Sequence, residues 1–354
     1  MDFSIAAILA QDGITSGAVY ALLALALVLV FSVTRVIFIP QGEFVAYGAL
    51  TVAAMQSNKF PQSAGLTLAL GILVFLRQVF VTLRHAQLRS GAVRSLSIDS
   101  IKFVVLPAIV YWLCRKFAAD TLAPALQVLL ALAIVIPMGP LIYRLAFEPL
   151  AEASTLVLLI ASVGVHLALN GLGLVMFGAE GSRTTAFSDA RFEFGALSIS
   201  AQNVIVIAVA VALMVGLYLY FERTLYGKAL RATAVNRLGA RLVGIGTAPA
   251  VRRAFTVAAT LGALCGILIA PLTTIYYDSG FLIGLKGFVG AIIGGLVSYP
   301  GAALGALFVG QLESFSAFWN STLKEVAVFA VLIPVLILRS LLTRRADIEA
   351  DDEL

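Results

Sequence analysis

Long apolar runs with few charged residues recur along this chain of 354 residues. An α-helix needs about 20 mainly apolar residues to cross the hydrocarbon core of a bilayer. Candidate runs lie at 13–34, 36–56, 64–81, 103–118, 123–143, 154–177, 201–221, 254–275, 284–299, 300–318 and 323–342. Because the short runs fit half-spans or re-entrant segments, the sequence predicts an all-α, polytopic transmembrane helical bundle of about 8–11 spans with broken or re-entrant Gly-rich elements.

The composition excludes the soluble classes of protein. Apolar residues make up 61% of the chain and charged residues 12%, about half the share of a soluble domain. A disordered chain, a disulfide scaffold and a cytosolic enzyme are therefore excluded. Both cysteines, Cys114 and Cys265, lie inside apolar runs, where buried thiols are expected. The longest polar stretch, 222–253, is too short for a second domain, so residues 1–354 are predicted to form a single transmembrane domain.

The loop charges predict which loops face the cytoplasm. Basic residues gather in 222–253 and in 82–102, whereas 178–200 and 276–283 carry little excess of either sign. Under the positive-inside rule the two basic segments are cytoplasmic and the other two lie outside. The net charge of +5 is therefore a topology signal, and we expect membrane lipid rather than nucleic acid around the chain. The tail, 343–354, is a short charged cytoplasmic cap.

The sequence lacks the motifs of the common catalytic sites. It contains no G-x-x-x-x-G-K-[ST], no H-E-x-x-H and no G-x-S-x-G. Its two histidines, His85 and His166, are too far apart to suggest a metal cluster. His166 and Asn170 lie one turn apart within a span, where a hydrogen bond between helices is expected. We therefore expect no enzyme activity, no metal and no bound cofactor.

Several pairs of glycines stand four residues apart, which places each pair on one helix face. These pairs are Gly13/Gly17, Gly262/Gly266, Gly290/Gly294 and Gly301/Gly305. Small residues at this spacing allow helix backbones to approach closely in lipid. The densest run, 284–295, permits a second interpretation, a broken helix that lines a solute route.

Three ionisable residues interrupt apolar runs. A charge at the bilayer centre costs roughly 2.5–3.5 kcal/mol on insertion scales, so such residues are candidates for function. Glu43 follows Pro40 and Gly42, where a helix breaks, and is expected to border a half-helix. Lys286 and Glu313 are expected to pair between neighbouring spans, with snorkelling to the interface as the alternative.

The residue pattern of the loop segment 226–246 predicts a short amphipathic helix that ends in glycine. A short cytoplasmic helix with small residues suits docking into a groove of a partner protein. The alternative is a basic connector held at the lipid headgroups.

Three blocks of this sequence together match the pattern of one known family. The first is Gly17-Ala18-Val19-Tyr20-Ala21-Leu22, running on to Gln41-Gly42-Glu43-Phe44. The second is the 226–246 loop, which is similar to the family's cytoplasmic signature. The third and most specific runs from Gly284-Leu285-Lys286-Gly287-Phe288 to Glu313. Together the three blocks resemble the permease subunits of branched-chain amino acid ABC transporters, and the form of 41–43 is similar to the first of that family's two permease types.

The resemblance implies a membrane subunit that works with several partners. They are two cytoplasmic ATPase subunits that bind ATP, a second permease subunit and an extracytoplasmic solute-binding protein. It implies that a helix in the cytoplasmic loop couples to the ATPase through Gly227, Arg231, Ala232, Ala234, Ala240, Leu242, Gly244 and Ile245. It also implies a translocation pathway lined by Gln41, Gly42, Glu43, Lys286, Gly287, Gly290, Gly294, Gly295 and Glu313.

The sequence also departs from the family pattern. Residues 64–118 hold extra sequence, including the basic segment 82–102, and the usual C-terminal Arg-Pro-x-Gly-Leu is replaced by residues 339–342. The expected function is a multi-pass permease of the cell inner membrane for branched-chain or related amino acids. An importer of amides or urea within the same family, and a stand-alone secondary transporter or channel, remain alternatives.

Overall fold

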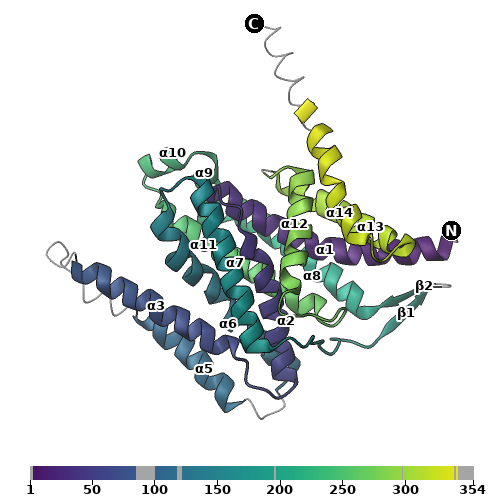
Figure 1. The fold of residues 1–354 in the computed structure, drawn as a ribbon, viewed down its shortest axis with the longest axis horizontal. Helices are drawn as coiled ribbons and strands as arrows, with labels where there is room; N and C mark the ends of the chain where they lie inside the picture. The colour runs from purple at the N-terminus through teal and green to yellow at the C-terminus, as the bar shows by residue number, and fades with distance from the viewer. Residues whose placement is uncertain are drawn as a thin grey trace, which may run out of the picture. The chain divides into compact units, whose positions relative to one another are not determined.

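The computed structural model describes residues 3–84, 100–117, 122–194, 197–296, 298–338 and 340–341, and most of these are helical (Figure 1). The helices and strands are α1 (Phe3–Thr34), η1 (Ile39–Gly42), α2 (Glu43–Gln56), α3 (Ser63–Arg84), η3 (Ile101–Val105), α5 (Leu106–Lys116), α6 (Pro124–Ile142), η4 (Tyr143–Phe147), η5 (Glu148–Leu150), α7 (Thr155–Phe177), β1 (Arg191–Phe194), β2 (Leu197–Ser200), α8 (Ala201–Arg223), α9 (Leu225–Val235), α10 (Arg237–Leu242), α11 (Thr247–Ile269), α12 (Ser279–Gly294), α13 (Tyr299–Trp319) and α14 (Lys324–Ala330). Most of the predicted segment 82–102, and all of the tail 343–354, lie outside the described residues.

The helices confirm the all-α, polytopic fold class. Within the described residues, six helices are long and apolar enough to cross a membrane, and they are Ser4–Thr34, Ser63–Thr82, Pro124–Leu150, Thr155–Phe177, Ala201–Arg223 and Thr247–Ile269. Two of the other predicted spans form shorter helices. The run 36–56 divides into the 3-10 helix η1 and the 14-residue α2, and α12 has 16 residues. Pro40 in η1 has no backbone N–H to donate, which favours a break at this point.

The described chain also contains a small β-hairpin, which the all-helical prediction did not include. Strands β1 and β2 pair antiparallel, with Arg191 opposite Ser200 and Phe194 opposite Leu197. Both strands lie in the loop 178–200, which the charge pattern places outside. Alternation of apolar and polar residues over only four positions is too short a signal to predict a strand.

The chain divides into two compact units. Unit 1 contains Met1–Val28, Asp189–Val215 and Leu285–Leu354, and unit 2 contains Leu29–Ser188 and Gly216–Gly284. The boundaries fall within α1, α8 and α12, so each of these helices contributes to both units.

Unit 2 is built around α11, which packs against both α2 and α6. Glycines make the close approach possible. A Cβ added at Gly48 would lie 2.6 Å from the carbonyl oxygen of Ala263, and one added at Gly262 would lie 2.7 Å from the Cβ of Phe44. The predicted role of the Gly262/Gly266 pair in close helix packing is confirmed.

Unit 1 uses glycine in the same way between α1, α12 and α13. A Cβ at Gly13 would lie 2.8 Å from the side chain of Gln311, and one at Gly17 would lie 2.9 Å from the Cα of Leu307. A polar contact also joins α1 and α13, because the Gln311 side-chain amide donates to the carbonyl of Ala10 at 2.9 Å. Each pair of glycines predicted to allow close packing therefore faces a neighbouring helix.

Candidate functional site

Unit 1 contains a buried network of three polar side chains. The Lys286 ammonium lies 2.6 Å from Oε1 of Glu313, and the hydroxyl of Tyr20 donates to Oε2 of Glu313 at 2.6 Å. The side chains of Lys286 and Glu313 are only 7% and 13% exposed. The predicted pairing between neighbouring helices is confirmed, because Lys286 belongs to α12 and Glu313 to α13.

Glycines on α12 bring these helices together. A Cβ added at Gly287 would lie 2.7 Å from the Cβ of Leu23, and one at Gly290 would lie 2.5 Å from the Cα of Ala306. At Gly294 an added Cβ would overlap the backbone of Gly301. A larger residue at these positions would push α12 away from α1 or α13, so these glycines let Lys286 reach Glu313.

Two residues govern the turn between α12 and α13. Gly295 has a φ of +84°, a left-handed conformation that favours glycine. The side chain of Ser298 caps the start of α13 by accepting from the backbone N–H of Gly301 at 3.2 Å. Gly294 and Gly295, which were predicted to line the translocation pathway, therefore lie where α12 ends.

Unit 2 contains a second buried polar group. Glu43 is the first residue of α2, as expected for a residue that borders a half-helix, and its side chain is fully buried. Its Oε1 lies 2.8 Å from Nδ1 of His166 on α7. The ring of His166 stacks on Phe281, with centroids 4.5 Å apart. His166 is thus a hydrogen-bonding residue between helices, as predicted.

Two oxygen atoms beside this contact have no hydrogen-bond partner within the described residues. They are Oε2 of Glu43 and Oε1 of Gln41. The amide nitrogen of Gln41 is satisfied, because it donates to the carbonyl of Ala258 at 2.9 Å. A buried polar atom without a partner costs free energy, so such atoms are expected where water or a solute arrives.

The backbone at Gly42 approaches another segment of unit 2 very closely. A Cβ at Gly42 would overlap the carbonyl of Gly280, and one at Gly284 would lie 2.9 Å from the Cα of Gly42. The break between η1 and α2 is therefore packed against the start of α12. Each predicted pathway residue belongs to one of two groups, with Gln41, Gly42 and Glu43 in unit 2 and the others in unit 1.

The loop after α8 forms two short helices, α9 and α10, rather than the single helix that the pattern predicted. The change occurs at Asn236, whose backbone is extended and whose Oδ1 accepts from the N–H of Gly239 at 2.8 Å. Asn236 therefore ends α9 and caps α10. The glycine ending is confirmed, since Gly244 follows α10 with a φ of +84°.

The predicted coupling residues divide between the surface and the interior of this loop. Arg231, Leu242 and Gly244 are exposed, whereas Gly227 and Ala240 are buried. A Cβ at Gly227 would lie 2.6 Å from the Cα of Phe221, so this glycine lets α9 fold back on the end of α8. The remaining members are partly buried, and they are Ala232, Ala234 and Ile245.

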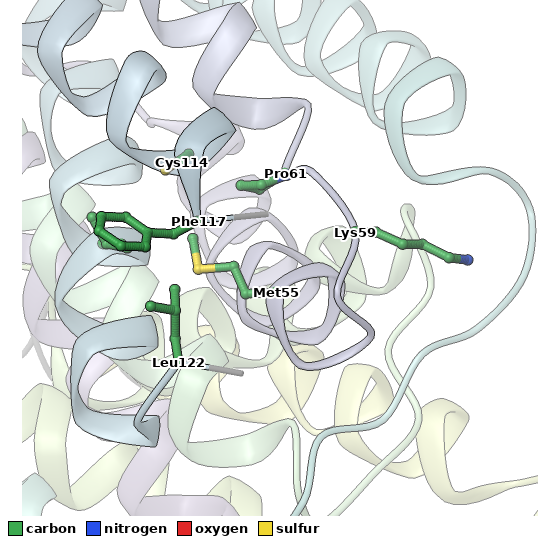
Figure 2. A pocket seen from close by; sticks show the side chains of 7 residues that line it. Met55, Lys59, Pro61, Cys114, Phe117 and Leu122 are labelled. Carbon is green, nitrogen blue, oxygen red and sulfur yellow. The ribbon is translucent and has the colours of Figure 1, made fainter. Parts of the chain in front are cut away.

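A very small cavity of about 10 Å³ lies between the end of α2, the connection to α3, the end of α5 and α6. Figure 2 shows Met55, Cys114, Phe117 and Leu122 around it, while the side chain of Lys59 points away. This volume holds about one water molecule, and its walls are mainly apolar. The cavity therefore offers no room for a solute.

Sequence reasoning missed Tyr20 and the connection between His166 and Glu43. Tyr20 lies in an apolar run and looks like a packing residue, and the two partners His166 and Glu43 are 123 residues apart. In both cases the sequence offered one signal, a polar residue within an apolar run. Within the described residues, no group of three His, Cys, Asp or Glu side chains is placed to hold a metal ion.

Comparison with known proteins identifies the family. The family model described as "Branched-chain amino acid transport system / permease component" matches residues 9–338. The chain is 26% identical over 341 residues to the high-affinity branched-chain amino acid transport system permease protein BraD of Pseudomonas aeruginosa, covering 93% of this chain and 92% of that protein.

A second relative is LivH of Escherichia coli K12, a high-affinity branched-chain amino acid transport system permease protein. It is 31% identical over 218 residues, which cover 58% of this chain and 70% of LivH. No solved structure matches. The match to the family model extends over nearly the whole chain, so this multi-pass membrane protein belongs to the family of permease components of branched-chain amino acid transport systems.

Proposed function

We propose that the chain is the first-type permease subunit of an ABC importer that carries branched-chain or related amino acids across the cell inner membrane. Cytoplasmic ATPase subunits bind and hydrolyse ATP, a second permease subunit completes the membrane part, and an extracytoplasmic binding protein delivers the solute. The full-length similarity to BraD supports this assignment.

The observation that carries the proposal is an exposed apolar surface on the loop formed by α9 and α10. Leu225, Leu238, Leu242 and Val243 are 84%, 68%, 80% and 75% exposed. Leu238 and Leu242 stand four residues apart on α10 and so face the same side, and exposed apolar side chains that lie together mark an interaction site. Since the loop also carries most of the basic excess, it lies on the cytoplasmic side, where ATPase subunits bind.

A packed route leads from this loop to the broken element of unit 2. Arg237 at the start of α10 lines a cavity of about 20 Å³ with Tyr143 and Phe255. Phe255 in turn packs on Phe38, the residue just before η1, with ring centroids 4.8 Å apart. A displacement of α10 is therefore transmitted to the segment that positions Glu43.

The buried polar groups supply the translocation pathway in this proposal. Glu43 and Gln41 in unit 2, and Lys286 and Glu313 in unit 1, are polar residues among apolar helices. Ionisable residues within spans usually face a bundle interior or a water-filled cavity. ATP binding by the partners would shift the permease pair between two states that expose this pathway to opposite sides.

Affinity purification from mildly solubilised membranes tests the proposal. The tagged chain is expected to bring down an ATPase subunit and a second permease subunit. Leu242→Asp places a charge on the exposed surface of α10 and is expected to reduce the recovered ATPase subunit. Phe192→Asp, on the hairpin strand β1, is the matched control because Phe192 is also exposed at 47%. Recovery of the chain alone, under conditions that keep it folded, would contradict the proposal.

A further inference from the structure

A groove of about 380 Å³ opens in unit 1 beside the Lys286–Glu313 pair. This volume falls in the range of small-molecule sites, about 300–1,000 Å³. Its walls come from the first turns of α1, the end of α13 and the start of α14, and they include Leu9, Asp12, Ser16, Glu313, Phe318 and Lys324.

Some of the charged side chains around the groove have ion-pair partners, and others have none among the described residues. Glu313 is bound by both Lys286 and Tyr20, and Lys286 also lies 4.0 Å from Glu325. Asp12 and Lys324 make no ion pair with any other described residue. The groove therefore offers one carboxylate and one ammonium group whose charges are free to bind a ligand.

A hydrocarbon surface is a poor environment for these groups. Asp12 and Lys324 lie on helices of a membrane protein, where a charge is tolerated beside water or beside another polar group rather than beside lipid. Leu9 and Phe318 add an apolar surface to the same groove. Opposite charges with an apolar wall match an α-amino acid, which carries an ammonium, a carboxylate and a side chain.

We propose that this groove binds the zwitterion of an apolar α-amino acid. The Asp12 carboxylate accepts from the α-ammonium group, Lys324 donates to the α-carboxylate, and Leu9 and Phe318 contact the side chain. Glu313, held by Lys286 and Tyr20, forms the floor. The inference rests on the proposed import function and extends it, because it names the groups that recognise the solute.

Uptake by the reconstituted importer tests the groove with L-leucine as the probe. The complete complex, with its ATPase subunits, second permease and binding protein, is placed in liposomes. Asp12→Asn and Lys324→Gln are each expected to lower kcat/KM for L-leucine uptake by about tenfold or more, as for loss of a charge-assisted hydrogen bond. Glu180→Gln, an exposed carboxylate in the 178–200 loop, is the matched control and should import like the wild type.

The outcomes separate this inference from the proposed function. A wild-type complex that fails to import any amino acid contradicts the import function and the groove together. A wild-type complex that imports L-leucine while both assembled variants import it equally well overturns the groove alone. Recovery of the ATPase subunit with each variant establishes that it has assembled.

Cysteine labelling provides a second readout that does not depend on removing a charge. Ser16→Cys places a thiol in the groove, and both native cysteines, Cys114 and Cys265, are buried. We expect a membrane-impermeant maleimide to label Ser16→Cys in the assembled complex, and L-leucine to slow this labelling at least twofold. Ser57→Cys, at an exposed position in unit 2, should be labelled at a rate independent of L-leucine. Absence of labelling at Ser16→Cys, or labelling that L-leucine does not slow, overturns the inference.

Discussion

The ammonium group of Lys286 lies 2.6 Å from the carboxylate of Glu313, and both side chains are nearly excluded from solvent. A pair of this kind gains little net stability over an apolar pair, but the loss of one partner leaves the other charge buried and unpaired. The pair therefore connects two helices, α12 and α13, whose close contact depends on Gly290 and Gly294.

Lys286→Met is expected to lower the free energy of unfolding by about 3 kcal/mol or more, because Glu313 loses its cation. The double variant Lys286→Met/Glu313→Gln should lose less than the sum of the two single variants. Unfolding in mixed micelles, followed by circular dichroism, measures these differences. Additive losses would show that the two side chains do not interact.

Gly294→Ala is expected to destabilise unit 1 strongly, because the added methyl group overlaps the backbone of Gly301. Gly164→Ala on α7 is the matched control, since a Cβ there meets nothing within 4 Å. Alanine is the better helix former, so the control should be neutral or slightly stabilising. Thermal denaturation in detergent compares the two. A Gly294→Ala midpoint equal to that of the control would refute the close contact.

His166→Leu should destabilise unit 2 more than Glu43→Gln does. The first change leaves the buried Glu43 carboxyl group without its hydrogen-bond partner on α7, at a cost of about 1–3 kcal/mol. The second change keeps a side-chain amide that can hydrogen-bond to Nδ1 of His166. The same mixed-micelle unfolding experiment ranks the two variants, and the reverse order would contradict a stabilising hydrogen bond between Glu43 and His166.

Leu242→Asp should leave the thermal midpoint of the purified chain within error of the wild type, because this side chain is 80% exposed. In the assembled importer it should reduce the ATP hydrolysis that accompanies solute uptake, since the apolar contact with the ATPase subunit is lost. Stimulated ATPase activity in proteoliposomes is the measurement. Full stimulation with Leu242→Asp would show that α10 does not couple to the ATPase.

Much of the fold follows from local sequence patterns. Pro40 and Gly42 predict the break before Glu43, and the glycine spacing predicts which helix faces pack closely. The pairing of Lys286 with Glu313 was predictable because a buried charge within a span needs a partner. These features depend on residues whose own chemistry restricts the structure around them. A glycine has no side chain and allows close packing, and a charge within a span needs a partner.

Other features depend on contacts between distant segments. Nothing near His166 in the sequence indicates that its partner is Glu43, and Tyr20 resembles an apolar packing residue. The division of the loop into α9 and α10 at Asn236 was missed, although Asn favours a helix start over a helix interior. Asp12 was not predicted as a functional residue, because its role depends on the groove that it shares with Lys324.

ATP-dependent uptake by the purified, reconstituted complex is the most direct test of the central claim, that this chain is a subunit of an importer driven by separate ATPases. The liposomes contain either the chain alone or the chain with its second permease, ATPase subunits and binding protein. We predict that L-leucine or a related amino acid accumulates only with the full set of partners and with ATP inside. Accumulation by the chain alone, without ATP, would contradict the claim and favour a stand-alone carrier.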